Sequence, residues 1–112
     1  MVTHNDSEVE LTEEEFNEII SNGHKLVVVD FFAEWCMPCV MMSPIIEELA
    51  ESITMKEVKF VKINTDDNPH LSQKYKISSI PCLVIFKKGK EVGRIVGWQA
   101  KEVLEEKIKG FL

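Results

Sequence analysis

Runs of apolar residues with two different spacings dominate the sequence. Residues Phe16 to Ile20 place apolar side chains at helical spacing, and the preceding Thr12 and Glu15 form a capping box that predicts where this helix begins. The Asn22-Gly23 pair predicts its end. Residues Leu26 to Phe32 are instead apolar on both faces and rich in β-branched residues, which is typical of a central strand covered by helices on both sides.

Further runs complete the expected order of elements. They predict a second two-sided strand at Val58 to Ile63, an edge strand near Glu8 to Glu10, helices at Pro38 to Ser52, Asp67 to Tyr75 and Glu102 to Phe111, and strands at Cys82 to Phe86 and Glu91 to Val96. Pro44 lies inside the first of these helices, and Ile53 and Val103 are expected to be buried. The short segment Lys88-Gly89-Lys90 lies between the last two strands, which predicts an antiparallel hairpin.

This alternation of strands and helices indicates an α/β fold. Helices are expected on both faces of a central mixed β-sheet. The 112 residues suffice for one hydrophobic core and are too few for two, so we expect a single domain over residues 1–112. A hydrophobic fraction of 45% and a charged fraction of 29% are typical of a globular protein that remains in solution.

Charge and terminal composition exclude several classes of partner. A net charge of −6 disfavours nucleic acid, which requires a basic surface to displace counterions from phosphate, and it also disfavours anionic membranes. Residues Met1 to Glu10 lack the basic and apolar regions of a signal peptide. The longest apolar run, Leu26 to Ala33, is interrupted by Asp30 and is shorter than the roughly 20 residues that span a bilayer. We therefore expect a cytoplasmic protein.

A pair of cysteines lies where the first long strand ends and a helix begins, in the segment Trp35-Cys36-Met37-Pro38-Cys39. The partial positive charge and free N–H groups of a helix N-terminus favour a thiolate at Cys36. Cys39 follows one helical turn later, within reach of a disulfide, and Pro38 stiffens the short loop. The arrangement predicts thiol–disulfide exchange, with Cys36 as the exposed attacking thiol and Cys39 as the resolving thiol.

Two other interpretations of this pair remain open at this stage. A C-x-x-C segment also forms half of many zinc sites, but a second pair is absent and Cys82, His4, His24 and His70 are isolated at spacings that do not suit ligands. We therefore expect no metal. The alternative is that both cysteines are structural, which their place at a strand–helix junction disfavours.

Asp30 and Ile80-Pro81 are candidate parts of the same site. A carboxylate within an apolar strand is costly to desolvate, which predicts a raised pKa, and Asp30 could exchange a proton with Cys39 from beneath the helix. The alternative is a structural carboxylate paired with Lys62 of the neighbouring strand. For Ile80-Pro81 the residues alone favour an ordinary trans turn, whereas a cis bond could leave the Ile80 backbone free to pair with a substrate strand.

Three further features admit a structural and a functional interpretation. Cys82, inside an apolar strand, is most simply a small core residue, but it could be a third redox thiol or complete a three-cysteine metal site. The methionines at 37, 41 and 42 suggest a soft-metal site or, more simply, packing and surface contacts. Trp98 could extend a docking surface or cover the last helix.

Several separated motifs, in order, resemble the thioredoxin family over nearly the whole chain, from about Val9 to Leu112. The motifs are Val29-Asp30-Phe31-Phe32-Ala33-Glu34-Trp35-Cys36-Met37-Pro38-Cys39, Pro44, Lys62-Ile63-Asn64, Ile77, Ile80-Pro81, Phe86-Lys87-Lys88-Gly89 and Val96-Gly97. The resemblance implies a thioredoxin fold and a protein-disulfide reductase that cycles Cys36 and Cys39 between dithiol and disulfide. It also implies that Asp30 is a buried proton acceptor linked to Lys62, and that the Ile80-Pro81 bond is cis.

The resemblance further implies a substrate surface and partners. The residues expected on the substrate-binding rim are Trp35, Met37, Pro38, Ile80, Pro81 and Gly97. We expect disulfide-containing proteins as substrates, recycling by a thioredoxin reductase, peroxiredoxins among the partners, and a monomer without a cofactor. Electron transport and cell redox homeostasis are the corresponding cellular roles.

Four positions depart from the commonest pattern of the family. Met37 stands where glycine is usual, Phe32 where tryptophan is usual, Val40 where lysine is usual and Cys82 where threonine is usual. Because the residues between and beside the cysteines tune the redox potential, an oxidant or isomerase remains an alternative to a reductase. A non-catalytic interaction module and a metal-binding scaffold are the alternatives outside disulfide chemistry.

Overall fold

A four-stranded mixed sheet forms the centre of the molecule. The computed structural model describes residues 10–21 and 23–112. Most of the expected edge strand near Glu8 to Glu10 and Asn22 of the expected helix end lie outside these residues. The strands are β1 (Leu26–Phe32), β2 (Val58–Asn64), β3 (Cys82–Lys87) and β4 (Lys90–Val96). Their order in the sheet is β2-β1-β3-β4, with β1 parallel to β2 and antiparallel to β3, and β3 antiparallel to β4.

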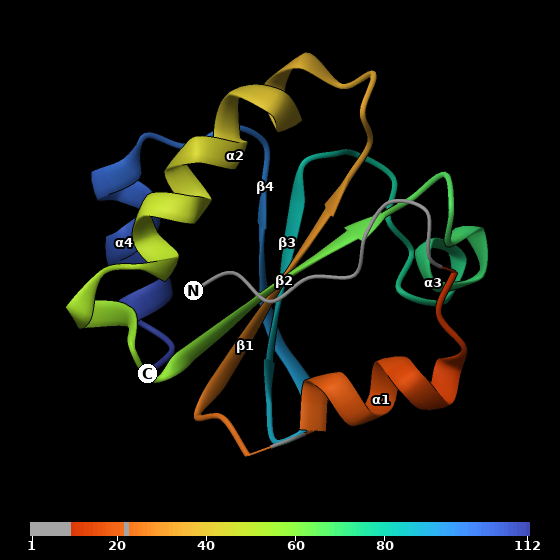
Figure 1. Cartoon of the computed structure of the whole chain (residues 1–112), viewed down its shortest axis with the longest axis horizontal. Coiled ribbons are helices and arrows are strands. Elements are labelled where there is room, and N and C mark those ends of the chain that lie inside the picture. Colours follow the sequence, from red (N-terminus) through yellow and green to blue (C-terminus); the bar gives the residue numbers. More distant parts are fainter. Residues whose placement is uncertain (1–9, 22) are drawn as a thin grey trace.

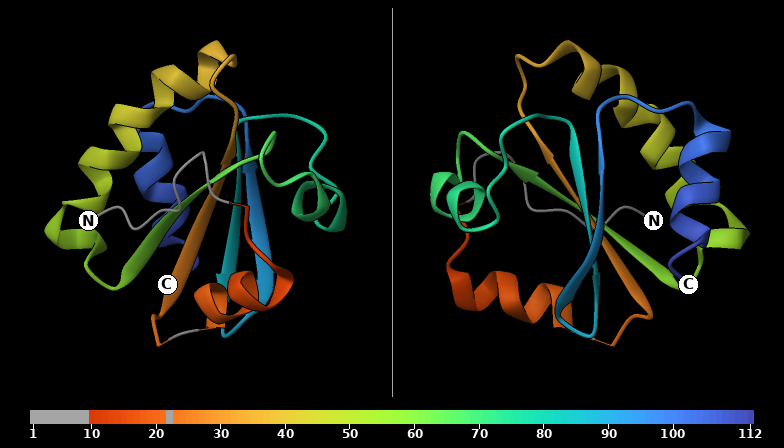
Figure 2. Two further views of the ribbon diagram at one scale, coloured as in Figure 1. Left: turned by 45° about the vertical axis from the view of Figure 1, so that its right-hand side comes forward. Right: turned by 180° about the vertical axis from the view of Figure 1, so that it is seen from behind.

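Helices cover both faces of the sheet, as the sequence predicted. They are α1 (Glu13–Ser21), α2 (Met37–Ala50), α3 (Pro69–Lys74) and α4 (Lys101–Lys109), with a 3-10 helix, η1 (Ile53–Met55), after α2. Figure 1 shows α2 and α4 on one side of the sheet and α1 and α3 on the other, and the turned views of Figure 2 show the same layers. The described residues thus form the three-layer α/β fold that the alternation indicated.

Local signals in the sequence account for where these elements begin and end. The capping box is confirmed, because the Glu15 amide donates to Thr12 Oγ1 at 3.0 Å and the Thr12 amide donates to Glu15 Oε1 at 2.9 Å. The hairpin between β3 and β4 is confirmed as well, and it turns through Lys88 and Gly89 at φ values of 52° and 80°. Pro44 lies inside α2 without ending it.

The two faces of β1 pack against different layers, and this decides where its polar residue points. Leu26 and Val28 belong to the cluster that contains the buried residues of α2 and α4. Val27, Val29 and Phe31 belong to the cluster that contains the buried residues of α1 and α3. Because side chains alternate along a strand, Asp30 lies on the α2 face, in line with Leu26 and Val28.

Two residues that the sequence predicted to be buried are exposed. Ile53 is 80% exposed because α2 ends at Ala50 and η1 turns this side chain outward. Val103 is 43% exposed because Leu104 and Ile108 supply the buried stripe of α4. None of the helices in the described part of the chain has the length and apolar character needed to cross a bilayer.

Candidate active site

The two cysteines lie at the N-terminus of α2, directly after the loop that follows β1. Cys36 is the N-cap residue of the helix, and the Cys39 amide donates a hydrogen bond of 3.3 Å to Cys36 Sγ. Pro38 occupies the first turn, where a missing N–H leaves no bond unmade. Cys36 and Cys39 form a disulfide, with their Cα atoms 5.2 Å apart. A helix-terminal N–H therefore contacts the sulfur that the sequence assigned to attack.

The expectation that Cys36 is exposed is wrong for this disulfide state. The residue is only 4% exposed, since it packs with Ala33 and Cys39 and against the half-buried Phe32 and Ile80. Its Sγ lies 3.7 Å from the Ile80 carbonyl oxygen. A partner must therefore reach the sulfur between the residues that surround it.

The surroundings of Cys36 are apolar and open to solvent. Trp35 is 71% exposed and Met37 is 65% exposed, and Val40 and Met41 also present half or more of their surface. Met42, in contrast, is fully buried under α2. The three methionines of this region therefore divide into two surface residues and one core residue, which is the packing interpretation of their spacing.

The loop before β3 forms the other side of the site. The Ile80-Pro81 bond is cis, as the family resemblance implied, so the trans turn favoured by the residues alone is wrong. The Gly97 amide donates a 2.8 Å hydrogen bond to the Pro81 carbonyl, and Gly97 has φ of +89°. Pro81 itself is buried, while Ile80 and Gly97 are half-buried. The structure thus places Ile80 against Cys36 and joins Gly97 to the same loop through Pro81.

Asp66 is a contact that reasoning from the sequence missed. The Trp35 Nε1–H donates a 2.9 Å hydrogen bond to Asp66 Oδ2. Trp35 follows β1, and Asp66 follows β2. Because the carboxyl ends of parallel strands lie at the same edge of a sheet, the parallel pairing was the signal that could have placed them together. The bond fixes one edge of the exposed indole ring.

Asp30 is buried on the sheet face beneath α2. Its Oδ1 has no hydrogen-bond partner among the described residues. Burial raises the pKa of the Asp30 carboxyl from 3.8 to about 7, and the charge of Lys62 opposes this shift. The raised pKa that the sequence predicted for Asp30 therefore agrees with its burial, and desolvation of the carboxylate is the cause.

Lys62 is the register partner of Asp30 across the β1–β2 pairing. Its ammonium donates a 3.1 Å hydrogen bond to Ser43 Oγ and lies 4.6 Å from the centroid of the Phe32 ring. Ser43 was missed from the sequence, although it follows Cys39 by four residues on α2, the spacing of neighbours on one helix face. Lys62 therefore acts on Asp30 through its charge while its described hydrogen bond is to Ser43.

Cys82 lies on the other face of the sheet. It is 2% exposed and belongs to the cluster that includes Phe31, Val84 and Phe86, between the sheet and the α1–α3 layer. Burial raises the pKa of its thiol, and the nearby Arg94 guanidinium opposes that shift. This placement favours the core interpretation, because the sheet separates the Cys82 side chain from the layer of α2. In residues 10–21 and 23–112, no group of three His, Cys, Asp or Glu side chains is arranged to hold a metal ion.

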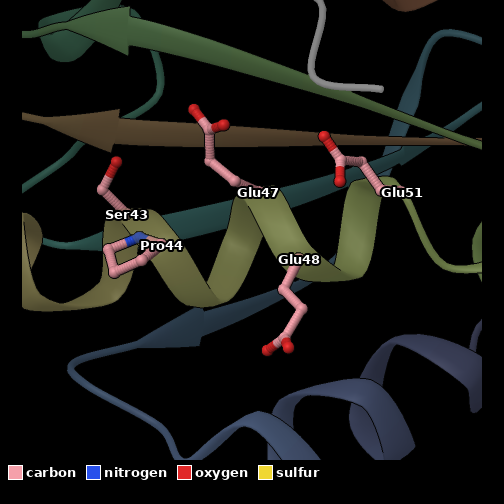
Figure 3. Close-up of a pocket in the computed structure, with 5 residues that line it drawn as sticks. All are labelled: Ser43, Pro44, Glu47, Glu48 and Glu51. Atoms are coloured by element: carbon pink, nitrogen blue, oxygen red, sulfur yellow. The ribbon is translucent and has the colours of Figure 1, made fainter.

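A hollow of about 620 Å³ lies along α2, away from the cysteine pair. Its lining residues are Ser43, Pro44, Glu47, Glu48 and Glu51. Figure 3 shows Ser43, Glu47 and Glu51 extending to one side of the helix and Glu48 to the other, toward α4, where the Lys101 ammonium lies 3.6 Å from its carboxylate. These carboxylates are an acidic solvated face of the helix rather than part of the site.

Comparisons with known proteins agree with this geometry. The family model described as Thioredoxin matches residues 7–110. The thioredoxin of Chlamydia pneumoniae is 48% identical over 94 residues, which cover 84% of this chain and 88% of the relative. A solved Plasmodium falciparum thioredoxin superposes with a TM-score of 0.81 at 34% identity, over 92% of this chain and 98% of that one.

A third similar protein comes from a structural study of thiol resolving in a yeast mitochondrial 1-Cys peroxiredoxin via the glutathione/thioredoxin systems. That chain has a TM-score of 0.80 and 31% identity, and the match covers 90% of this chain and 92% of the other. Sequence and fold therefore lead to the same group of proteins.

Proposed function

This chain belongs to the thioredoxin family and is a thiol–disulfide oxidoreductase, and from that premise we propose that it serves as a general reductase of protein disulfides. The observation that carries the proposal is the Cys36–Cys39 disulfide at the N-terminus of α2, beneath an exposed apolar rim. Residues 1–112 then act as one domain, without a cofactor.

The first half of the proposed cycle forms a mixed disulfide. In the reduced protein the Cys36 thiolate, which the helix N-terminus stabilises, attacks one sulfur of a substrate disulfide. The substrate S–S bond breaks, a new bond joins Cys36 Sγ to the substrate, and the other substrate sulfur leaves as a thiolate. The hydrogen bond from the Cys39 amide to Cys36 Sγ supports this assignment of the attacking sulfur.

The second half releases the substrate. Cys39 transfers its proton to the Asp30 carboxylate, and the resulting Cys39 thiolate attacks Cys36 Sγ. The substrate leaves as a second thiolate, so it gains two electrons in all, and the Cys36–Cys39 disulfide forms. The position of Asp30 on the α2 face and its pKa of about 7 support its role as proton acceptor near neutral pH. The charge of Lys62 favours the ionised carboxylate that accepts the proton.

Substrates are proposed to bind as extended segments over the rim around Cys36. The rim residues are Trp35, Met37, Pro38, Ile80, Pro81 and Gly97. The high exposure of the Trp35 and Met37 side chains supports this role, because the free energy falls when a partner covers apolar side chains that were exposed to water. The buried Pro81 contributes through the shape of its loop.

Family membership implies protein disulfides as substrates and a reductase that recycles the oxidised form. We propose a thioredoxin reductase for that step and peroxiredoxins among the recipients of electrons; the peroxiredoxin study that contains a similar chain supports the second of these. Working as a monomer in the cytoplasm, the protein would then contribute to electron transport and cell redox homeostasis.

A disulfide-reduction assay tests this function. Insulin is reduced in the presence of a candidate thioredoxin reductase and its electron donor, with wild type, Cys36→Ser and Cys82→Ser compared. Cys36→Ser should abolish turnover, while the chemically identical change at Cys82 should leave it intact. Equal activity of wild type and Cys36→Ser would reject the proposal and favour a non-catalytic role.

A further inference from the structure

The ammonium of Lys62 is held from two directions. Ser43 Oγ on α2 accepts a 3.1 Å hydrogen bond from it, and the Phe32 ring at the end of β1 lies 4.6 Å from it at the ring centroid. All three residues line a second hollow, of about 400 Å³, that Cys39 also lines. A lysine beside such a hollow could extend its ammonium into water, as long cationic side chains commonly do. Here a hydroxyl and an aromatic face hold it instead.

The charge of the held ammonium acts on the Asp30 carboxyl. Asp30 and Lys62 are register partners on neighbouring parallel strands, and both side chains lie on the face that α2 covers. In Figure 3 the Ser43 side chain extends from α2 to the side away from α4. We propose that Ser43 and Phe32 are positioning residues, which hold the Lys62 ammonium beside Asp30 and thereby set the pH at which that carboxyl exchanges its proton.

The physical reason is the distance dependence of the charge interaction. An ammonium near a buried carboxylate favours the ionised form, and its effect falls as the separation and the surrounding water increase. Without the Ser43 hydroxyl, Lys62 can move outward through the hollow, and Asp30 then loses part of this stabilisation. The carboxyl should hold its proton to higher pH.

The other titratable groups around Asp30 are unaffected by removing the Ser43 hydroxyl or the Phe32 ring. From α2 the facing groups are Cys36 and Cys39, which do not titrate while joined in a disulfide. The loop after β1 brings Glu34 to the same hollow, and Cys82 lies across the sheet. On β3 the register partner of Asp30 is the apolar Leu83. Variants at Ser43 and Phe32 leave all of these groups in place.

The inference deepens the proposed function, since the pH at which Asp30 titrates matters to turnover only if Asp30 accepts the Cys39 proton. It can nevertheless be tested without turnover. Carbon-13 NMR of the oxidised protein reports the titration midpoint of the Asp30 carboxyl directly. The variants are Ser43→Ala, Phe32→Leu, Lys62→Met and the double variant of Ser43→Ala with Lys62→Met. Ser43→Thr keeps a hydroxyl, and Lys101→Met removes a lysine that pairs with Glu48 instead.

Ser43→Ala and Phe32→Leu should each move the midpoint to higher pH, by less than Lys62→Met does. Ser43→Thr and Lys101→Met should leave it at the wild-type value. In the double variant the midpoint should equal that of Lys62→Met alone, because the hydroxyl acts only through the lysine. An unchanged midpoint in Ser43→Ala would overturn the inference. So would a shift by Ser43→Ala that is as large in the Lys62→Met variant as it is in wild type.

A separate measurement tests the proposed function beneath it. Asp30→Asn should alter the pH profile of insulin reduction if Asp30 accepts the Cys39 proton. An unaltered profile would remove that role from Asp30, whereas the NMR midpoints alone decide whether Ser43 and Phe32 position Lys62.

Discussion

The Gly97 amide donates a 2.8 Å hydrogen bond to the carbonyl oxygen of Pro81, and this bond ties the end of β4 to the loop that contacts Cys36. The bond depends on a backbone conformation with φ of +89° at Gly97, which side chains with a Cβ disfavour. A Cβ added there would meet no atom within 4 Å, so backbone strain, not crowding, is the cost of substitution.

Gly97→Ala should therefore lower the free energy of unfolding by about 1 kcal/mol and raise the KM for protein disulfides. Gly23→Ala is a matched control, since Gly23 has φ of +73°, has the same open surroundings and lies on the loop before β1. It should show a similar loss of stability, measured by urea unfolding, and an unchanged KM. An equal rise in KM for both variants would contradict a specific role for the Gly97–Pro81 bond.

Asp30 predicts how stability depends on pH. Its carboxyl has a pKa of about 7 in the folded protein and an ordinary value of 3.8, so between these values the folded state binds more protons than the unfolded state. Stability contributed by the neutral carboxyl is present below about pH 4 and is lost as pH rises to about 7, up to about 4 kcal/mol in all.

Asp30→Asn removes this dependence. The stability of the variant relative to wild type should rise between pH 4 and pH 8, measured by urea unfolding of the oxidised proteins. The comparison near pH 3.5 isolates the pH-independent effect of the amide. A constant difference across this range would show that Asp30 is ionised in the folded protein throughout.

Cys82→Ser should cost stability without affecting the chemistry. The thiol lies in the apolar cluster of the α1–α3 layer, where a hydroxyl is costlier to bury than a thiol even with the Arg94 guanidinium nearby, so we expect a loss of about 1 kcal/mol. Turnover and redox potential should equal those of wild type, because the side chain lies on the sheet face opposite α2. A changed potential, measured by equilibration with glutathione, would restore Cys82 as a third redox thiol.

The same equilibrium distinguishes a reductase from an oxidant. The resemblance to thioredoxins predicts a potential near −270 mV, and we expect Met37 and Val40, which stand beside the cysteines, to shift it by no more than tens of millivolts. Met37→Gly, which restores the usual dipeptide, measures the contribution of that side chain. A wild-type value at or above about −180 mV would indicate an isomerase or oxidant instead.

Patterns that are local in the chain could be predicted from the sequence. The capping box at Thr12 and Glu15, the two-sided strand β1, the hairpin at Lys88-Gly89 and the cysteine pair at a strand–helix junction each depend on residues a few positions apart. Their periodicity and spacing reflect backbone geometry and hydrogen bonding that operate within one element. Together they were enough to indicate the fold class and disulfide exchange.

The burial and partners of the site residues were decided by the tertiary structure. Cys36 is covered because the Ile80 loop packs over it, and Lys62 donates to Ser43 because α2 lies across β2 at that position. The Trp35 bond to Asp66 likewise depends on two segments 31 residues apart. Such contacts follow from strand register and helix packing, where an offset of one residue reverses the face on which every side chain lies.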